Sequence, residues 1–346
     1  MQALILAGGE GTRLRPLTSA VPKPVVPLVD RPFIAYMLEW LRGHGVDDVI
    51  MSCGFLAGGV RDVLGDGSAH GIRLRYVEEP EPLGTGGALK FAEELLDERF
   101  LMLNGDVLTD LDITAQLALH EARGARGTLG LTPVDDPTAY GLVRTRIDGE
   151  VTGFVEKPAP EQVDTRNISA GIYVLERSVL ELLEPGRRAS IERDVFPRLV
   201  GDGLYAFVGE GYWLDIGTPE RYLQGTADIL DGTVRTGVET APALIGPGAE
   251  VAPDATIGTG VVLGAGVTIG AGTSVERAVV FDGATVGAGC VLRDCVVAAG
   301  ARIGDGTRVE GFSMLGEGVR VGAGNVITHG ARLFPGVDIP DGGMLF

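Results

Sequence analysis

The last hundred residues follow a six-residue period, which limits the possible folds more than any other feature of the chain. From about residue 244, an aliphatic or aromatic side chain recurs at every sixth position, and Gly or Pro often follows it. With two steps of five, the series is Ile245, Val251, Ile257, Leu263, Ile269, Val275 and Phe281, then Val286, Leu292 and Ala298, then Ile303, Val309, Leu315, Val321, Ile327 and Leu333. Three hexads make one triangular coil, so the pattern predicts a left-handed parallel β-helix of hexapeptide repeats over residues 244–346.

The residues before the repeats alternate between short apolar strands and amphipathic helices. Strands are expected at 3–7, 49–53, 72–77 and 100–103, and helices at 32–42 and 57–64. This alternation predicts an α/β domain over 1–232, with a mixed, mainly parallel Rossmann-like sheet and flanking helices, joined to the β-helix by a linker over 233–243. Residues 128–175 are strand-rich, with Asp148-Gly149 as a hairpin turn, and two helices are expected near 177–183 and 191–200.

A glycine-rich loop with two arginines follows the first strand. The stretch reads Leu-Ile-Leu-Ala-Gly-Gly-Glu-Gly-Thr-Arg-Leu-Arg-Pro over residues 4–16, and three prolines then surround Lys23 in a segment expected to be extended. Glycines let the backbone approach an anion closely, and guanidinium groups bind oxyanions with two hydrogen bonds. The loop therefore predicts a phosphate site.

Two familiar phosphate-binding patterns do not fit this loop. A P-loop needs a lysine after its second glycine, and the chain has no lysine before Lys23. The dinucleotide fingerprint needs a third glycine or alanine, where this chain has Leu14. The phosphate site is thus of another kind.

Further candidate residues come at the ends of later strands. A second glycine-rich loop, Glu-Pro-Glu-Pro-Leu-Gly-Thr-Gly-Gly-Ala-Leu over residues 79–89, is read either as a plain turn before a helix or as a second wall of the same pocket. Asp106 and Asp215 each follow an apolar strand, where a carboxylate is placed to hold a divalent metal against phosphate. Asp112 is interpreted as a helix N-cap.

Charge and cysteine content exclude several classes of function. The formal net charge of −18 argues against a nucleic-acid or anionic-membrane partner, since both need a basic surface. No signal peptide or long apolar run is found, so a cytoplasmic location is expected. The three cysteines have no metal-ligand spacing and are read as reduced, small apolar residues. Only three lysines occur, and two of them, Lys23 and Lys157, precede proline.

Taken together, these stretches resemble the signature of the sugar-1-phosphate nucleotidyltransferases, and the resemblance covers nearly the whole chain. The motifs that carry it are Leu-Ala-Gly-Gly-x-Gly-Thr-Arg-Leu from Leu6, Pro22-Lys23-Pro24, Leu83-Gly84-Thr85-Gly86-Gly87-Ala88, Gly105-Asp106, Glu156-Lys157-Pro158, residues 168–173 and Trp213-Leu214-Asp215-Ile216-Gly217. Together with Ser190–Pro197 and the hexapeptide tail, they look most like the mannose-1-phosphate guanylyltransferase subfamily. Two positions depart from it: Gly86 stands where alanine is usual, and Gly105 where serine is usual.

The resemblance implies a role for each matching position. It places the β- and γ-phosphates of a nucleoside triphosphate on Gly8, Gly9, Gly11, Thr12 and Arg13, with Lys23 bridging toward the α-phosphate. It assigns Mg²⁺ to Asp106 and Asp215, the sugar phosphate to Lys157, and the sugar hydroxyls to Glu156, Asn167 and Gly141. The base pocket is expected to be lined by Leu6, Ala7, Pro82, Gly84 and Thr85.

The implied reaction joins GTP to mannose-1-phosphate and releases pyrophosphate. The residues agree with it, because a sugar phosphate is already an anionic nucleophile and needs positioning and charge cancellation more than a base. Three alternatives stay open: glucose-1-phosphate with dTTP, UTP or ATP, or a cyclitol phosphate; a regulatory paralogue that binds without turnover; and acyl transfer by the repeats, for which only His329 is available as a base. The repeats are expected to join copies of the chain into a homo-oligomer.

Overall fold

The computed structural model describes residues 1–54 and 56–345, and it divides into two compact units. Met1–Glu10 and Ile34–Trp213 form one, called here the sheet unit. Gly11–Phe33 and Leu214–Phe346 form the other, called the coil unit. The loop over residues 4–16 therefore supplies residues to both units, and the boundaries drawn from the sequence at 232 and 244 stay a prediction.

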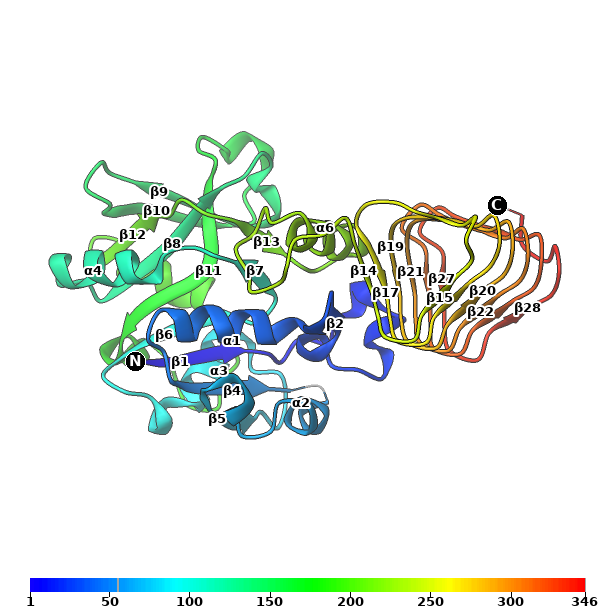
Figure 1. The fold of residues 1–346 in the computed structure, drawn as a ribbon. Coiled ribbons are helices and arrows are strands. Elements are labelled where there is room, and N and C mark those ends of the chain that lie inside the picture. The colour runs from blue at the N-terminus through cyan, green and yellow to red at the C-terminus, as the bar shows by residue number, and fades with distance from the viewer. Residues whose placement is uncertain (55, 346) are drawn as a thin grey trace. The chain divides into compact units, whose positions relative to one another are not determined.

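The sheet unit is built on a nine-stranded mixed sheet (Figure 1). Its main strand order is β10-β9-β11-β6-β1-β4-β5, with β8 between β11 and β12. The strands are β1 (Gln2–Leu6), β4 (Asp48–Cys53), β5 (Arg73–Glu78), β6 (Arg99–Asn104), β8 (Gly127–Pro133), β9 (Gly141–Thr145), β10 (Val151–Glu156), β11 (Asn167–Glu176) and β12 (Leu204–Val208). Strands β6, β1, β4 and β5 are parallel, whereas β9, β10 and β11 run antiparallel to their neighbours, as the predicted mixed sheet requires.

The helices of the sheet unit follow from local sequence. They are α1 (Phe33–Gly43), α2 (Ala57–Leu64), α3 (Gly84–Phe91), α4 (Ile113–Arg123) and α5 (Phe196–Leu199). Asp112 caps α4 as predicted, because its Oδ1 accepts a hydrogen bond from Ala115 N at 3.0 Å. The short strand β7 (Val107–Thr109) lies between β6 and α4.

Two expected helices are shorter and less regular than predicted. Arg177–Leu182 is a 3₁₀ helix, and Ile191–Val195 is a π-helical turn that leads into α5. Pro197 has no N–H with which to continue an α-helical hydrogen-bond ladder, so the turn before it adopts another spacing. The segment around Lys23, expected to be extended, forms 3₁₀ turns at Leu17–Ser19 and Lys23–Val25. The fixed φ of proline suits both conformations.

The core of the sheet unit is a continuous layer of aliphatic and aromatic side chains. One ring contacts two others in this core: Phe196 lies 4.9 Å from Tyr173 and 5.3 Å from Phe154, measured between ring centroids. Such tilted aromatic contacts add to the free energy gained from burial. They anchor the 190–197 segment on strands β10 and β11.

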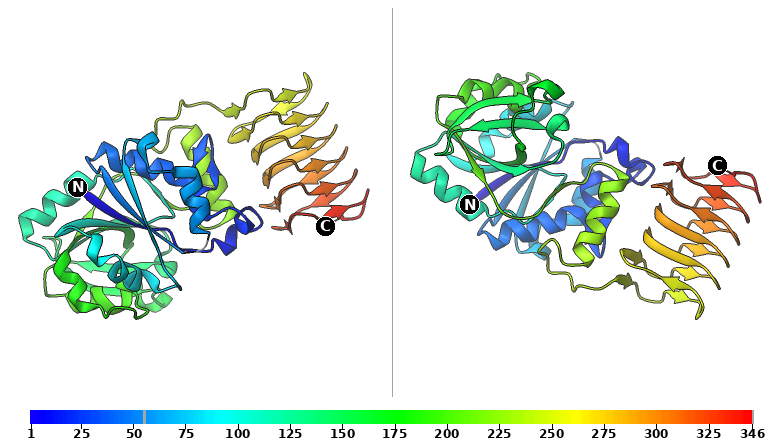
Figure 2. Two further views of the ribbon diagram at one scale, coloured as in Figure 1. Left: turned by 90° about the horizontal axis from the view of Figure 1, so that it is seen from below. Right: turned by 90° about the horizontal axis from the view of Figure 1, so that it is seen from above.

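The coil unit consists mainly of stacked parallel strands, seen as successive coils in Figure 2. The strands are β14 (Ala243–Ile245), β15 (Glu250–Val251), β16 (Thr256–Ile257), β17 (Val261–Leu263), β18 (Thr268–Ile269), β19 (Ser274–Val280), β20 (Thr285–Val286), β21 (Val291–Val297), β22 (Arg302–Ile303), β23 (Arg308–Val309), β24 (Met314–Leu315), β25 (Arg320–Val321), β26 (Val326–Ile327), β27 (Arg332–Leu333) and β28 (Asp338–Ile339). They form the predicted parallel β-helix.

The inward-facing positions of the β-helix differ from the predicted series at both steps of five. Val280 and Val297 are fully buried in the coil core, in place of Phe281 and Ala298. The step occurs one hexad earlier because Arg277 and Asp294 turn the corner alone, with φ values of 42° and 47°. Ile245, in the first coil, is 47% exposed and does not belong to the core.

A second inward column lies two residues before the aliphatic one. It holds small side chains, among them Ala278, Ala284, Cys290, Cys295 and Ala301. All three cysteines of the chain are free and buried, and burial raises the pKa of the Cys53 thiol to about 12. This agrees with their reading as small apolar residues.

Two non-repeat segments complete the coil unit. Helix α6 (Pro219–Leu230) packs on β19 and β21, and it also contacts β2 (Pro27–Leu28), which pairs with β3 (Arg31–Pro32). The hydroxyl of Tyr222 on α6 donates a hydrogen bond to Pro27 O at 2.6 Å. Strand β13 (Trp213–Asp215) precedes α6 in the chain. Among the described residues, no helix combines the length and apolar composition needed to cross a membrane.

Candidate functional site

The candidate residues of the sheet unit gather along one edge of the sheet. Strands β1 and β6 are parallel and both end there, at Leu6 and Asn104, which are paired in register. Strand β11 runs antiparallel to β6 and so begins at this edge, with Asn167. Strand β9 runs antiparallel to β11, and the pairing of Leu142 with Ile168 places Gly141 beside the start of β11. Glu156 ends β10 and is paired with Gly141. Residues expected to bind nucleotide and residues expected to bind sugar are thus neighbours across the strand ends.

The first part of the glycine loop is held against the ends of β4 and β5. Ala7 N donates to Ser52 O at 2.8 Å, and a Cβ added to Gly54 would lie 3.1 Å from Gly8 O. Beside them, the carboxylate of Glu79 accepts hydrogen bonds from Ser52 Oγ at 2.8 Å and from Leu83 N at 3.1 Å. Gly9 is exposed, with open space where a side chain would be. The turn is therefore fixed by its neighbours while its outer face stays open.

Asp106 is set by a close approach of two strand ends. Gly105 N donates to Leu6 O at 2.9 Å, and a Cβ on Gly105 would lie 2.7 Å from that same oxygen. Only glycine fits this contact without a backbone shift, and it leaves Asp106 half-buried directly after the strand. Nearby Asp110 is buried and binds the backbone, with Oδ1 accepting from Tyr212 N at 2.7 Å.

The second glycine loop turns part of its surface inward. Gly86 and Gly87 are buried, whereas Pro82 and Gly84 are exposed. The hydroxyl of Thr85 donates to Glu192 Oε2 at 2.7 Å and accepts from Ile191 N at 3.0 Å. The loop is thus a tightly attached helix start as well as a candidate wall of the base pocket.

The candidate sugar-binding group combines a half-buried carboxylate with an exposed ammonium. Burial raises the pKa of Glu156, the negative charge of Glu192 adds to this, and Lys157 and Arg193 oppose it. Lys157 has a φ of 52°, and its N–H donates to Tyr140 O at 2.9 Å. This left-handed backbone conformation is unusual for lysine, and the surrounding strand end holds it in place.

The coil unit contains the remaining phosphate-binding candidates. Gly11 has a φ of 61°, and a Cβ there would lie 3.1 Å from both Lys23 Cβ and Thr18 Cγ2. Thr18 Oγ1 donates to Gly11 O at 2.7 Å, which closes the turn. Lys23 is only 8% exposed, and its aliphatic stem borders a small gap of about 10 Å³ lined by Leu14, Val26, Leu28, Phe33, Ile216 and Tyr222. Burial of the stem limits the positions that the Lys23 ammonium group can take.

Arg13 and Asp215 both lie close to Gly217. A Cβ added to Gly217 would be 2.5 Å from Arg13 Nη2 and 3.0 Å from Asp215 Oδ1. The glycine therefore leaves room for a guanidinium beside a carboxylate. Thr12 and Arg13 are exposed, in the short 3₁₀ turn Thr12–Leu14.

The donor chemistry of the two aspartates fits a divalent cation of the Mg²⁺ type. Among the described residues, no three acidic, histidine or cysteine side chains form a complete metal cage. Mg²⁺ is usually held by one or two carboxylates together with phosphate oxygens and water, and Asp106 and Asp215 each supply a carboxylate of this kind.

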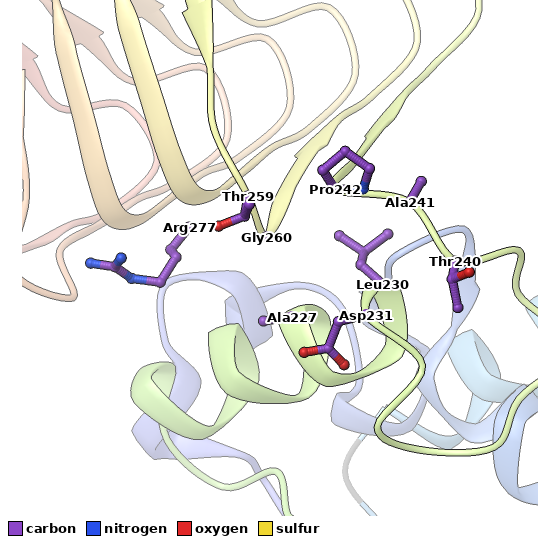
Figure 3. A pocket seen from close by; sticks show the side chains of 9 residues that line it. All are labelled: Ala227, Leu230, Asp231, Thr240, Ala241, Pro242, Thr259, Gly260 and Arg277. Carbon is purple, nitrogen blue, oxygen red and sulfur yellow. The ribbon is translucent and has the colours of Figure 1, made fainter.

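The sequence did not predict three residues that shape these places: Glu79, Glu192 and Gly217. Glu79 lies in the second glycine-rich stretch, and Ser190–Pro197 and Gly217 lie within quoted motifs, but no pattern tells which residues they contact. A cavity of about 360 Å³ in the coil unit, between α6 and the first coils, contains no predicted site residue (Figure 3). Its lining includes Leu230, Thr240, Thr259 and Arg277.

Comparison with known proteins gives matches over both parts of the chain. The family model described as Nucleotidyl transferase matches residues 2–232, and the model described as GMPPB C-terminal domain matches residues 240–340. The mannose-1-phosphate guanylyltransferase of Mycobacterium tuberculosis is 40% identical over 82% of this chain and 80% of its own length. The UTP–glucose-1-phosphate uridylyltransferase of Synechocystis is 34% identical over 70% and 68%.

Solved structures with a similar fold are also found. HddC from Yersinia pseudotuberculosis, 32% identical, covers 65% of this chain and 97% of its own with a TM-score of 0.57. A glucose-1-phosphate thymidylyltransferase candidate from Bacillus anthracis, 24% identical, matches the fold with a TM-score of 0.62 over 69% of this chain and 98% of its own. The family model spans all the residues that form the sheet edge and its loops, and by this match the chain belongs to the nucleotidyl transferase family.

Proposed function

We propose that the chain is a mannose-1-phosphate guanylyltransferase, which transfers the guanylyl group of GTP to mannose-1-phosphate and releases pyrophosphate. The observation that carries the proposal is the single sheet edge shared by the Gly8 loop, Asp106, Gly141, Glu156 and Asn167. The 40% identity to the Mycobacterium tuberculosis enzyme of that name supports the choice of substrates. So does the similarity to HddC, which has been solved in complex with GMP-PN.

In the proposed reaction, a phosphate oxygen of the sugar phosphate attacks the α-phosphorus of the triphosphate in line. One phosphorus–oxygen bond forms, the bond to the β,γ-diphosphate breaks, and pyrophosphate leaves with the electron pair. The nucleophile is already an anion, so no general base is needed, and the barrier depends on positioning and on cancelling charge between the two phosphates. Arg13 and Lys23 bind the triphosphate oxygens, with the backbone of Gly8, Gly9, Gly11 and Thr12.

The other roles follow from the chemistry of each side chain. Lys157 binds the phosphate of the sugar phosphate. Glu156, Asn167 and Gly141 form hydrogen bonds with the hydroxyl groups of the sugar. Leu6, Ala7, Pro82, Gly84 and Thr85 line the base pocket. Asp106 and Asp215 would hold Mg²⁺, which would supply positive charge that offsets the charge on the phosphate oxygens.

An assay of pyrophosphate release tests the assignment. Wild type is combined with GTP, dTTP, UTP or ATP and with mannose-1-phosphate or glucose-1-phosphate, with and without Mg²⁺. Highest kcat/KM with GTP and mannose-1-phosphate is expected; a preference for UTP and glucose-1-phosphate would instead favour the activity named for the Synechocystis relative. Binding of sugar nucleotide without turnover of any pair would point to a regulatory paralogue.

Substitutions then test the mechanism. Lys23→Met and Asp106→Asn are each expected to lower kcat by roughly 100-fold or more, the usual loss when one charge-stabilising group is removed. Lys90→Met is the matched control: this lysine is ion-paired with Glu93 at 2.8 Å and lies outside the proposed site. Full activity of Lys23→Met would refute the mechanism.

The proposal extends to assembly and location. Repetitive β-helix faces pair readily with copies of themselves, so the chain is proposed to form a homo-oligomer through the β-helix. Light scattering of the full chain at working concentration measures this, and a monomer mass would refute it. The three free cysteines agree with a reducing compartment such as the cytoplasm.

A further inference from the structure

The second glycine loop is attached by its backbone to a segment a hundred residues later in the chain. Gly86 N and Gly87 N both donate to Ala189 O, at 2.9 and 3.2 Å. In return, Ala189 N donates to Leu83 O at 2.9 Å. The start of α3 and residues 187–191 therefore form one hydrogen-bonded unit.

The glycines of the loop are needed for this attachment. A Cβ on Gly84 would lie 2.6 Å from Ala189 O, and one on Gly87 would lie 2.8 Å from Arg187 O. Both contacts are with backbone atoms, which cannot move away without a shift of the chain. At Gly86 the nearest contacts would be 3.1 to 3.2 Å, with Leu183, Ala189 and Ile191. Part of the glycine content thus serves packing between two segments.

One carboxylate joins the two segments by side-chain contacts. Glu192 Oε2 accepts hydrogen bonds from Thr85 Oγ1 at 2.7 Å and from Ser190 Oγ at 2.6 Å. Thr85 Oγ1 also accepts from Ile191 N at 3.0 Å. Hydrogen bonds to an ionised acceptor are stronger than neutral ones, so this oxygen is the firmest side-chain link between the loop and the 190–196 segment.

The same carboxylate also acts on the candidate sugar-binding group. Its negative charge adds to burial in raising the pKa of Glu156, while Lys157 and Arg193 lower it. Burial raises the pKa of Tyr173, and the negative charges of Glu192 and Glu156 add to this effect. The Tyr173 hydroxyl lies 3.0 Å from Ser169 Oγ. The turn Ile191–Val195, which carries Glu192, also contacts β10, the strand that ends at Glu156.

We infer that Glu192 is a positioning residue that fixes the base-binding loop through Thr85 and sets the charge environment of Glu156, so that one side chain links nucleotide selection to sugar binding. The inference rests on the proposed function for the identity of the two substrates. The attachment of the loop does not depend on that identity.

Four variants separate the two effects. Glu192→Gln removes the charge, and Thr85→Val removes the hydroxyl while leaving Glu192 in place. Thr85→Ser keeps the hydroxyl and serves as the conservative rescue. Glu184→Gln is the matched control, since Glu184 is an exposed carboxylate of the same region, 72% accessible and paired with Arg187.

Steady-state kinetics give the first readout. Glu192→Gln and Thr85→Val are each expected to raise KM for the preferred triphosphate about tenfold and to reduce its advantage over the other triphosphates, equivalent to about 1.4 kcal/mol per tenfold change. The double variant is expected to lose no more than the worse single variant, because both act on one hydrogen bond. Thr85→Ser, which keeps the hydroxyl, is expected to recover most of what Thr85→Val loses, and Glu184→Gln should match wild type.

The pH profile separates the charge effect from the loop effect. Removing the charge of Glu192 moves the pKa of Glu156 back down, so the acid limb of kcat/KM for the sugar phosphate shifts to lower pH in Glu192→Gln. Thr85→Val retains the charge and should leave that limb where it is. Phosphate ionisation is common to both variants and cancels in the comparison.

Amide hydrogen exchange at residues 83–91 provides a readout independent of activity. Faster exchange at Gly86 and Gly87 is expected in Glu192→Gln and Thr85→Val, with no change in Glu184→Gln. Unchanged exchange, or unchanged triphosphate selection in an active enzyme, overturns the inference. A wild type that turns over no pair refutes the proposed function instead, while the exchange result still decides whether Glu192 holds the loop.

Discussion

At the scale of single residues, Gly217 shows how a missing side chain positions a charged one. The Cβ of an alanine at this position would lie 2.5 Å from Arg13 Nη2. Because a guanidinium on a flexible stem can move away, Gly217→Ala is expected to leave thermal stability nearly unchanged. The displaced Arg13 should nevertheless lower kcat/KM for triphosphate about tenfold or more, since misplacement of a binding group is costly in catalysis.

Thermal unfolding and pyrophosphate-release kinetics of Gly217→Ala test this prediction. Gly58→Ala is the control, because nothing lies within 4 Å of the Cβ that it would add on α2. Wild-type kinetics in Gly217→Ala would show that triphosphate turnover does not depend on the position of Arg13 beside Gly217.

Gly105 gives the opposite balance between stability and activity. An added Cβ would lie 2.7 Å from Leu6 O and 3.0 Å from Ile5 Cγ2, and the backbone of β1 cannot yield as a side chain does. Gly105→Ala is expected to destabilise the sheet unit by roughly 1–3 kcal/mol, the range for strained core substitutions. The urea midpoint followed by tryptophan fluorescence measures this, since both tryptophans, Trp40 and Trp213, lie in the sheet unit.

Gly43→Ala is the matched control for Gly105→Ala, as its added Cβ would meet open space. Equal midpoints for the two variants would contradict the close approach of β1 and β6.

At the scale of elements, the phase of the β-helix is the clearest difference between expectation and structure. Arg277 and Asp294 each turn a corner with a single residue of positive φ, and Arg277 donates to both carboxylate oxygens of Asp294, at 2.6 and 2.8 Å. This ion pair holds two successive shortened corners together. Exposed ion pairs contribute little on their own, but this bidentate geometry fixes the register of β19 on β21.

The shifted phase predicts which side chain carries the stability of this coil. Val280→Ala removes fully buried atoms and is expected to cost about 2 kcal/mol, whereas Phe281→Ala should cost less although phenylalanine is larger. Chemical denaturation followed by circular dichroism ranks the two variants. A larger loss for Phe281→Ala would restore the phase predicted from the sequence.

At the scale of the whole molecule, His120 links stability to pH. Its ring is fully buried, with Nδ1 2.8 Å from Thr128 Oγ1 and Nε2 3.0 Å from Glu176 Oε1. Burial lowers the pKa of His120 below its ordinary value, and the hydrogen bond to Glu176 only partly opposes this. The unfolded chain therefore binds a proton near its usual pKa of about 6.5 that the folded chain does not bind.

Stability is accordingly expected to be highest above about pH 6.5 and to fall as the pH drops below it. Urea midpoints between pH 5 and 8 should show this slope, and His120→Gln should flatten it, with His70→Gln as the control for the substitution itself. A slope unchanged in His120→Gln would assign the pH dependence to other groups. Burial raises the pKa of Glu176, but its hydrogen bonds with His120 and Arg99 lower it by more, so the pKa lies below its ordinary value. Glu176 therefore contributes to the pH dependence of stability at lower pH than His120 does.

The sequence predicted those features that repeat locally or follow directly from chain direction. An inward aliphatic residue at every sixth position predicts a coil because the same short-range geometry recurs in each hexad. Strand-end motifs such as Gly105-Asp106 place residues at a sheet edge, since parallel strands end on one side. Asp112 could be identified as a cap because its partner, Ala115, is three residues away.

The sequence by itself therefore determined the two architectures, the loops that carry the candidate chemistry and the class of reaction. Only the tertiary structure decided that Glu192 holds Thr85, that the corners at Arg277 and Asp294 shift the coil phase, and that Gly217 leaves space for Arg13. The reason is physical: a period or a cap depends on neighbours a few residues away. A hydrogen bond across a hundred residues, or a gap left by a missing Cβ, exists only once the packed chain brings those atoms together.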